Sequence, residues 1–178
     1  MKNLVLMSSN KDKLKEFKQF IPNIEMKKGP DLKEVDGTKK EVALYKSLMS
    51  GENTIIEDTI LMINDEEVVD IKWKVKSLKK NVDASWITTL AVNKDGVIYL
   101  YEGCVNGKII PEKFTEDSFG FDSVFQPKNS DMTLHELKDK KESYSARKIA
   151  IEKLKNNNFY FKEIVKNIPT WEGKWQNK

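Results

Sequence analysis

The sequence predicts an α/β fold in which helices flank a mixed β-sheet. Apolar residues recur at helical spacing near both ends of the 178-residue chain, whereas short runs rich in β-forming residues occupy its middle. The early runs alternate with helical segments, and the later ones are joined by turn sequences typical of hairpins. A chain of this length fits one domain better than several.

The first predicted elements are a strand, a polar turn and a helix. Leu4–Met7 is a short apolar run, and Leu14, Phe17 and Phe20 follow it at helical spacing. Asn10 lies between them and is suited to cap the helix, because its side-chain oxygen can accept hydrogen bonds from the first free N–H groups. We therefore expect Asn10 to be the N-cap.

A second helix is predicted to begin at Lys39 and to end near Gly51. Thr38 and Glu41 form a capping box, in which each side chain bonds to the backbone of the other residue. The loop before it, residues 27–37, is polar and contains glycine and proline, which break regular structure.

Residues 54–63 are predicted to form a buried strand that carries two acids. The segment is apolar except where Glu57 and Asp58 interrupt it. Residues 70–80 are then predicted to form a short, lysine-rich helix.

Three further strands are predicted to form an antiparallel meander. Residues 86–92 and 97–101 are rich in β-forming residues and are joined by a hairpin sequence, Asn93–Gly96. Asn106-Gly107 predicts a second turn, before a third strand at residues 108–110.

The C-terminal part is predicted to contain two helix starts. Thr133 and Glu136 form a second capping box, and residues 145–154 carry an apolar helical face.

Composition excludes several classes of protein. The net charge is +3, 39% of the residues are hydrophobic, and no apolar run approaches the roughly 18 residues of a membrane span or the length of a secretory signal. Cys104 is the only cysteine and His135 the only histidine, which excludes disulfide frameworks, Cys/His zinc sites and nucleophiles paired with histidine. We expect a cytoplasmic protein without a membrane partner, whose chemistry comes from carboxylates, lysines and hydroxyls.

Three carboxylates are candidates for binding a divalent cation. Glu57 and Asp58 interrupt an apolar run, where charges are costly unless a cation compensates them, and Glu34 lies in the loop before the second helix. Mg²⁺ takes oxygen ligands from one or two carboxylates and completes its shell with water and phosphate. The alternative is a strand end that emerges into solvent.

Other residues are candidates for contacts with a nucleotide. Ser8, Ser9 and Asn10 precede a helix whose free N–H groups could bind a phosphate, with Lys13 one turn along, although an ordinary N-cap explains them as well. Arg147 is the only arginine beside 30 lysines, and lysine cannot imitate its planar fork.

Aromatic and lysine-rich segments leave two interpretations open. Phe119 and Phe121 flank a glycine and could stack on a base, or they could belong to the core. The lysines of residues 72–80 could contact nucleic acid or phosphate, or could form a solvated helix face. A net charge of only +3 with interspersed acids argues against nucleic acid as a partner.

In order over residues 3–155, these segments resemble the inosine triphosphate pyrophosphatase family, whose members hydrolyse deaminated purine nucleoside triphosphates to the monophosphate and pyrophosphate. Ser8-Ser9-Asn10 with Lys13 resembles the phosphate loop of this family. Glu34 resembles its metal-binding acid, and Glu57-Asp58-Thr59 resembles its central acidic motif.

The second half of the chain carries the remaining motifs. Ile71-Lys72-Trp73 is similar to a segment of the eukaryotic-type members, and Phe119-Gly120-Phe121-Asp122 resembles the base-stacking motif. Lys141 with Ser145-Ala146-Arg147 resembles the family's lysine and Ser-His-Arg signature, with Ala146 in place of the histidine that favours keto over amino purines.

The resemblance implies an elongated fold with two lobes and a substrate cleft between them, Mg²⁺ as cofactor, a nucleoside triphosphate as substrate and a homodimer. Its implied site residues are, for the metal, Glu34, Asp58 and Glu57; for catalysis, Asp58, Glu57, Lys13 and Lys72; and for the substrate, Ser8, Ser9, Asn10, Phe119, Phe121, Asp122, Lys141, Ser145 and Arg147.

We therefore expect an enzyme that cleanses the nucleotide pool of ITP, dITP and XTP. Its pyrophosphatase-like domain is expected at residues 1–167, followed by a tail of unassigned role at residues 168–178. Two alternatives stay open because of Ala146, namely a pyrophosphatase with shifted base specificity and a nucleotide-binding protein with impaired catalysis. A nucleic-acid-binding domain is the third.

Overall fold

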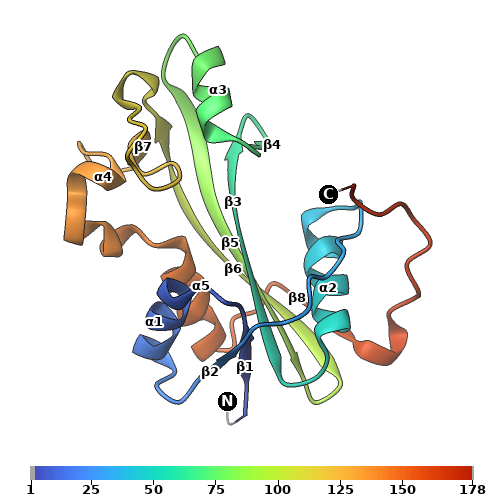
Figure 1. Ribbon diagram of the computed structural model, residues 1–178. Coiled ribbons are helices and arrows are strands. Elements are labelled where there is room, and N and C mark those ends of the chain that lie inside the picture. Colours follow the sequence, from blue (N-terminus) through green and yellow to red (C-terminus); the bar gives the residue numbers. More distant parts are fainter. Residues whose placement is uncertain (1–2, 178) are drawn as a thin grey trace. The chain divides into compact units, whose positions relative to one another are not determined.

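The computed structural model describes residues 3–177 and confirms an α/β fold with a mixed sheet flanked by helices (Figure 1). Its strands are β1 (Val5–Met7), β2 (Glu25–Lys27), β3 (Thr54–Ile63), β4 (Glu66–Glu67), β5 (Val82–Lys94), β6 (Val97–Ile109), β7 (Phe125–Pro127) and β8 (Phe161–Ile164). Its helices are α1 (Lys11–Phe20), α2 (Lys39–Ser50), α3 (Ile71–Ser77), α4 (Leu134–Leu137) and α5 (Ala146–Lys155), and the short 3₁₀ segments are η1 (Pro111–Lys113), η2 (Lys138–Tyr144) and η3 (Val165–Asn167).

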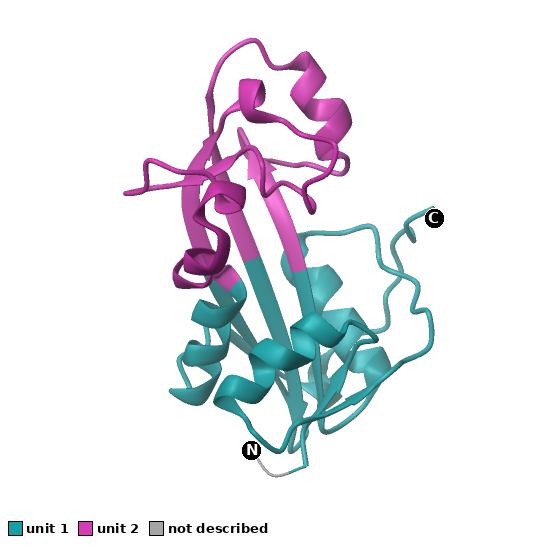
Figure 2. Ribbon diagram, turned by 60° about the vertical axis from the view of Figure 1, so that its left-hand side comes forward, with its two compact units in different colours: residues 1–58, 88–103, 147–178 teal, residues 59–87, 104–146 magenta. Residues whose placement is uncertain are grey.

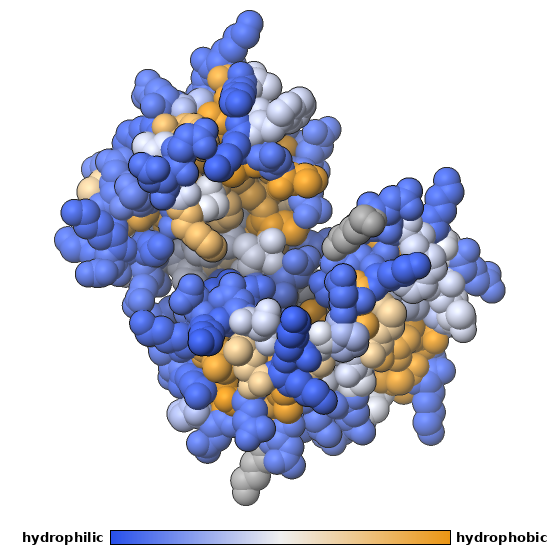
Figure 3. Space-filling view, in the orientation of Figure 1, coloured by the Kyte–Doolittle hydropathy of each residue, from blue (hydrophilic) through white to orange (hydrophobic). Residues whose placement is uncertain are grey.

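The strands form one eight-stranded sheet with the order β2-β1-β3-β5-β6-β7, in which β4 pairs with β3 and β8 with β6. β1 is parallel to β2 and β3, whereas β4, β7 and β8 are antiparallel to their partners. No helix among residues 3–177 is long and apolar enough to span a bilayer. Hydrophilic side chains cover most of the face shown in the space-filling view (Figure 3).

The predicted helix starts are confirmed in detail. The Asn10 side chain accepts hydrogen bonds from the backbone of Asp12 and Lys13, and both predicted capping boxes, at Thr38 and at Thr133, are present. These caps satisfy backbone N–H groups that have no partner inside a helix. The predicted helix at residues 70–80 is α3, with Asp70 as its N-cap.

The chain divides into two compact units, coloured in Figure 2. Unit 1 comprises residues 1–58, 88–103 and 147–178, as far as they are described. In one cluster of its core, Phe17 of α1 and Ile151 of α5 pack with Ile55 of β3 and Leu90 of β5. In a second cluster, Leu44 of α2 packs with the next residue of each of these two strands. Because successive strand residues point to opposite faces, helices bury both faces of this part of the sheet.

Unit 2 comprises residues 59–87 and 104–146, and includes α3, α4, β4 and β7. Its aromatic cluster consists of Trp86, Phe121 and Phe125, with ring centroids 5.6 to 6.3 Å apart in edge-to-face geometry. Such aromatic pairs add packing energy beyond the area they bury.

The first two strands of the predicted meander are confirmed as parts of β5 and β6, but the second turn and the separate third strand are wrong. The hairpin turn at Asp95 and Gly96 is present, with φ of 52° and 75°, but β6 continues through Asn106-Gly107 to Ile109. Gly107 is needed for another reason: a Cβ at this position would collide with the backbone carbonyl of Gln126 on β7. The glycine therefore marks the close approach of a paired strand and no turn.

Four short strands, β2, β4, β7 and β8, had no prediction. β2 has only three residues and pairs with β1, so it lacks a periodic pattern of its own. β4 forms a hairpin with β3 around Asn64 and Asp65, whose φ values of 51° and 63° are typical of a tight turn.

Candidate active site

A pocket of about 550 Å³ in unit 1 gathers predicted residues from four segments. Ser8 and Ser9 follow β1, Lys13 belongs to α1, Glu34 lies in the loop before α2, and Glu57 lies in β3. The wall is completed by Met7, Lys28, Gly29, Pro30, Asp31, Leu32, Lys46, Ser50 and Ile56. The parallel pairing of β1 with β3 brings the loop after β1 toward the acidic stretch of β3.

Glu57 is buried between two cations. Its side chain is 1% exposed, and its Oε2 lies 2.5 Å from Nζ of Lys13. Nε of Arg147 lies 3.6 Å from Oε1, and the same guanidinium donates to Glu16 at 2.6 Å. Because a buried carboxylate without a partner is costly, the lysine and the arginine explain how β3 tolerates an acid here.

A second ion pair approaches Asp58. Lys46 of α2 donates to Glu34 at 2.8 Å. Burial raises the pKa of Asp58, and the neighbouring carboxylates of Glu34 and Glu57 raise it further, while Lys46 and Lys13 lower it. Glu34, Glu57, Lys13 and Lys46 line the pocket and act on the charge of Asp58, which follows Glu57 in β3 but is not itself among the lining residues.

The donor set fits a hard divalent cation. No three acidic, histidine or cysteine side chains within residues 3–177 form a group that could hold a metal by themselves. Mg²⁺ needs only one or two carboxylates, because water and phosphate oxygens fill its other positions. Asp58, whose pKa is raised by burial and then by the carboxylates of Glu34 and Glu57, offers an oxygen ligand of this kind together with either of them.

The turn after β1 has a structural role in addition to its place in the pocket. Asn10 donates its backbone N–H to the Ser8 hydroxyl and uses its own side chain to cap α1. The Asn10 and Ser8 side chains therefore define the turn, whereas Ser9 is an exposed residue of the pocket wall.

The other predicted residues lie in unit 2, where they differ in environment. Phe119 is 81% exposed, whereas Phe121 packs in the aromatic cluster. Asp122 accepts a hydrogen bond from Lys141 at 2.9 Å. Lys72 of α3 lies 3.3 Å from Glu116 in an exposed pair.

The segment that resembles the Ser-His-Arg signature lies where the chain passes from unit 2 to unit 1. Ser145 and Ala146 are buried at the start of α5, with Ala146 fully so. Arg147, the next residue, directs its guanidinium to Glu16 and Glu57 in unit 1.

Comparison with known proteins shows the family of the chain. The model of the Ham1 family matches residues 4–67 and 65–157. The chain belongs to the Ham1 family.

Relatives and a solved structure support the assignment. An inosine triphosphate pyrophosphatase from Schizosaccharomyces pombe is 27% identical over 190 residues, which cover 94% of this chain and 98% of the relative. A dITP/XTP pyrophosphatase from Flavobacterium johnsoniae is 29% identical over 104 residues, covering 58% of this chain and 50% of the relative. A HAM1 protein from Coxiella burnetii shares the fold, with a TM-score of 0.70 and 22% identity over 88% of this chain and 98% of that one.

Glu16, Lys28 and Lys46 are charged residues in and around the pocket of this Ham1 chain that had no prediction. Glu16 holds Arg147, and it lies three positions after Lys13 on α1, so helix periodicity would have placed both on one face. Lys46 pairs with Glu34 and acts on Asp58, but nothing in the sequence separates it from the other lysines.

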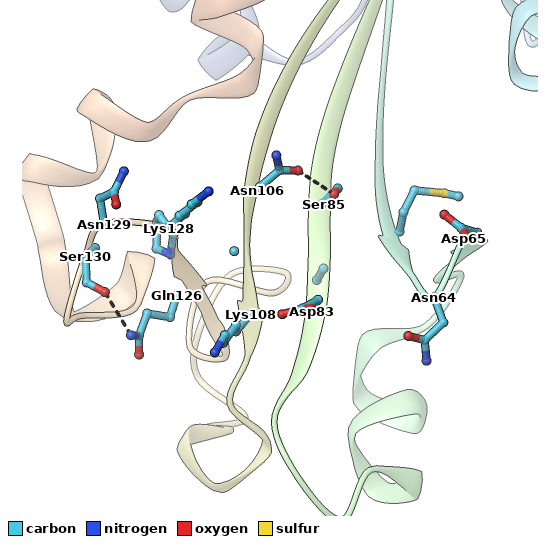
Figure 4. Close-up of a pocket in the computed structure, with 14 residues that line it drawn as sticks. Asn64, Asp65, Asp83, Ser85, Asn106, Lys108, Gln126, Lys128, Asn129 and Ser130 are labelled. Carbon is cyan, nitrogen blue, oxygen red and sulfur yellow. Dashed lines mark hydrogen bonds between the residues drawn. The ribbon is translucent and has the colours of Figure 1, made fainter.

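A larger cavity of about 610 Å³ in unit 2 of the Ham1 chain contains no predicted site residue. It lies over the polar face of β5, β6 and β7 (Figure 4), where Ser85 donates to Asn106 at 2.8 Å and Gln126 donates to the Ser130 carbonyl at 2.9 Å. Polar residues on one face of an antiparallel sheet are typical where the other face is buried.

Proposed function

We propose that this Ham1 chain hydrolyses deaminated purine nucleoside triphosphates such as ITP, dITP and XTP to the monophosphate and pyrophosphate, and so cleanses the nucleotide pool. The observation that carries the proposal is the buried Glu57 held between Lys13 and Arg147, beside an Asp58 whose pKa is raised. The names of the Schizosaccharomyces pombe and Flavobacterium johnsoniae relatives support the same reaction.

The lysines of the pocket would bind the triphosphate. Lys13, Lys28 and Lys46 line the same opening as Ser9 and supply positive charge where the phosphates would lie. Electrostatic stabilisation of this kind acts most strongly where charge develops on the leaving pyrophosphate.

Asp58, together with Glu34 or Glu57, would hold Mg²⁺. When bound, the ion would neutralise phosphate charge and polarise the phosphoryl oxygens. The proposal of Mg²⁺ and these ligands is supported by the carboxylates of Glu34 and Glu57 in the pocket and by the buried carboxylate of Asp58 on which they act.

Water would be the nucleophile, and the chain would orient it. A carboxylate that does not bind the metal, Glu34 or Glu57, would accept the proton of the attacking water. The new bond forms between the water oxygen and the α-phosphorus, and the bond to the bridging oxygen of pyrophosphate breaks. Lys13, already beside Glu57, would stay near the phosphates as charge moves to the leaving group.

Ala146 bears on base specificity. A methyl group replaces an imidazole that would supply a hydrogen bond, and this methyl group is fully buried. We propose a weaker preference for inosine over adenosine nucleotides than an enzyme with the histidine would have. The roles of Lys72, Phe119, Phe121, Asp122, Lys141 and Ser145 in substrate binding stay predictions, as do a homodimer and a cytoplasmic location.

The test is a nucleotide panel with purified protein and Mg²⁺, in which monophosphate and pyrophosphate are resolved from diphosphate and phosphate. The Asp58→Asn variant, prepared in parallel, controls for contaminating enzymes. Monophosphate and pyrophosphate from ITP, dITP or XTP would support the proposal. No turnover by a folded protein would overturn it in favour of a nucleotide-binding protein.

A further inference from the structure

The C-terminal tail pairs with the segment that carries Glu34. The backbone N–H of Gln176 donates to the Glu34 carbonyl at 2.9 Å, and the N–H of Asp36 donates to the Lys174 carbonyl at 2.9 Å. Between them, Val35 and Trp175 form an antiparallel bridge. The side chain of Gln176 adds a hydrogen bond to the Val35 carbonyl at 3.1 Å.

The tail is anchored on α2 at the same time. Trp171 packs edge-on against Tyr45, with ring centroids 5.2 Å apart, and the Tyr45 hydroxyl donates to the Pro169 carbonyl at 2.7 Å. The indole N–H of Trp171 donates to the Lys174 carbonyl at 2.9 Å, which closes the turn that leads to the paired residues. A Cβ at Gly37 would meet the Trp171 ring, so the loop also passes close to the anchor.

These contacts with the tail fix the position of Glu34, which lines the pocket. Residues 28–34 belong to no helix or strand, so hydrogen bonds with the tail take the place of regular structure at the end of this loop. Val35 is 1% exposed, and Lys46, the partner of Glu34, follows Tyr45 on α2. Both members of the Glu34–Lys46 pair are therefore attached to elements that the tail holds.

We propose that Trp171 and Gln176 are positioning residues that hold Glu34 in the pocket, and that the tail at residues 169–176 is a functional part of the site. This inference rests on the proposed role of Glu34. The tail lies beyond residue 157, where the match to the Ham1 family model ends, so it is a feature of this chain outside the matched region.

The test uses five single variants of the full chain, of which Glu34→Gln serves as the second background. Trp171→Ala removes the anchor, Trp171→Phe keeps a ring against Tyr45, and Gln176→Ala removes one bond to Val35. Phe159→Ala is the control, because it removes edge-to-face contacts with Tyr99 at 5.2 Å and Tyr101 at 6.5 Å that do not involve the tail.

Kinetics of a double-mutant cycle show whether the tail acts through Glu34. We expect Trp171→Ala to lower kcat/KM for ITP by about tenfold or more, as removal of a residue that orients a ligand does, and Trp171→Phe to restore most of it. In the Glu34→Gln background, Trp171→Ala should lower kcat/KM little further. Phe159→Ala should lower kcat/KM by the same small factor with Glu34 or with Gln at position 34. If the factors by which Trp171→Ala and Glu34→Gln lower kcat/KM multiply in the double variant, the two residues act independently and the proposal is overturned.

Hydrogen exchange provides a readout that needs no turnover. The amide of Asp36 should exchange faster in Trp171→Ala than in the unmodified chain, and at the unmodified rate in Phe159→Ala. Unchanged protection of Asp36 in Trp171→Ala would overturn the positioning role. If the unmodified chain hydrolyses no nucleotide, the proposed function fails, and exchange at Asp36 still decides whether the tail holds the Glu34 segment.

Discussion

Nζ of Lys13 lies 2.5 Å from the carboxylate of Glu57, whose side chain is 1% exposed. The lysine comes from α1 and the acid from β3, so the packing of the helix on the sheet sets the distance between them. Arg147 approaches the other carboxylate oxygen at 3.6 Å. Two fixed positive charges therefore surround this buried acid.

Breaking this pair should be costly. Lys13→Met leaves Glu57 buried with Arg147 alone, and we expect a loss of about 3 kcal/mol in the free energy of unfolding. Lys39→Met is the control, because its pair with Glu102 is about one-third exposed and such pairs contribute about 1 kcal/mol at most. Urea unfolding measures both variants, and equal losses would contradict the buried pairing.

Because the pKa of Asp58 is raised, its ionised carboxylate should lower the free energy of unfolding. A carboxyl group whose pKa is raised in the folded state favours the protonated form, so ionised Asp58 destabilises the protein at neutral pH. The cost is absent below the ordinary pKa of 3.8 and appears as the pH rises through the folded value. Asp58→Asn should therefore raise the Tm at neutral pH and lose that advantage in acid.

The same variant should be nearly inactive. Asn keeps the shape of the side chain but carries no charge with which to hold Mg²⁺, and we expect turnover to fall by about 100-fold or more. Thermal unfolding across the pH range, with ITP hydrolysis measured on the same preparations, checks both statements. A variant that is less stable than the parent at neutral pH, or that keeps parental turnover, would refute the role given to Asp58.

The two phenylalanines of the aromatic motif should behave differently. Phe119 is 81% exposed, so Phe119→Ala should change the free energy of unfolding by no more than about 0.5 kcal/mol and should raise the KM for ITP. Phe121→Ala removes a ring from the cluster with Trp86 and Phe125 and should cost about 2 kcal/mol. An unchanged KM in Phe119→Ala would remove Phe119 from base binding.

Ala146→His tests base specificity. If an imidazole restores one hydrogen bond to the base, the ratio of kcat/KM for ITP over ATP should rise about tenfold. Because Ala146 is fully buried, the larger side chain should also lower stability by about 1 to 3 kcal/mol. Steady-state kinetics with both nucleotides and thermal unfolding measure the two effects, and a constant ratio would show that this position does not read the base.

Local signals in the sequence predicted the helices well. The Asn10 cap and the Thr38 and Thr133 capping boxes depend on residues within three positions of each other, and all three are present. Gly107 misled the prediction because its role comes from Gln126 on another strand, which no local pattern reveals. β2 was missed for the same reason, since its pairing with β1 defines it.

In the candidate site, too, the sequence indicated single residues but not contacts between distant segments. Glu57 and Asp58 were evident as acids within an apolar run, and Arg147 as the only arginine. Lys46 could not be distinguished from the other lysines, because its contact with Glu34 depends on how α2 packs. The tail likewise contacts Glu34 from more than one hundred residues away in the sequence.

The most direct measurement is hydrolysis of ITP in water labelled with heavy oxygen, with Mg²⁺ present and the products analysed by mass spectrometry. Attack by water at the α-phosphorus predicts that the label enters the monophosphate and that pyrophosphate is unlabelled. Label in pyrophosphate, or formation of diphosphate and inorganic phosphate, would contradict the proposed reaction.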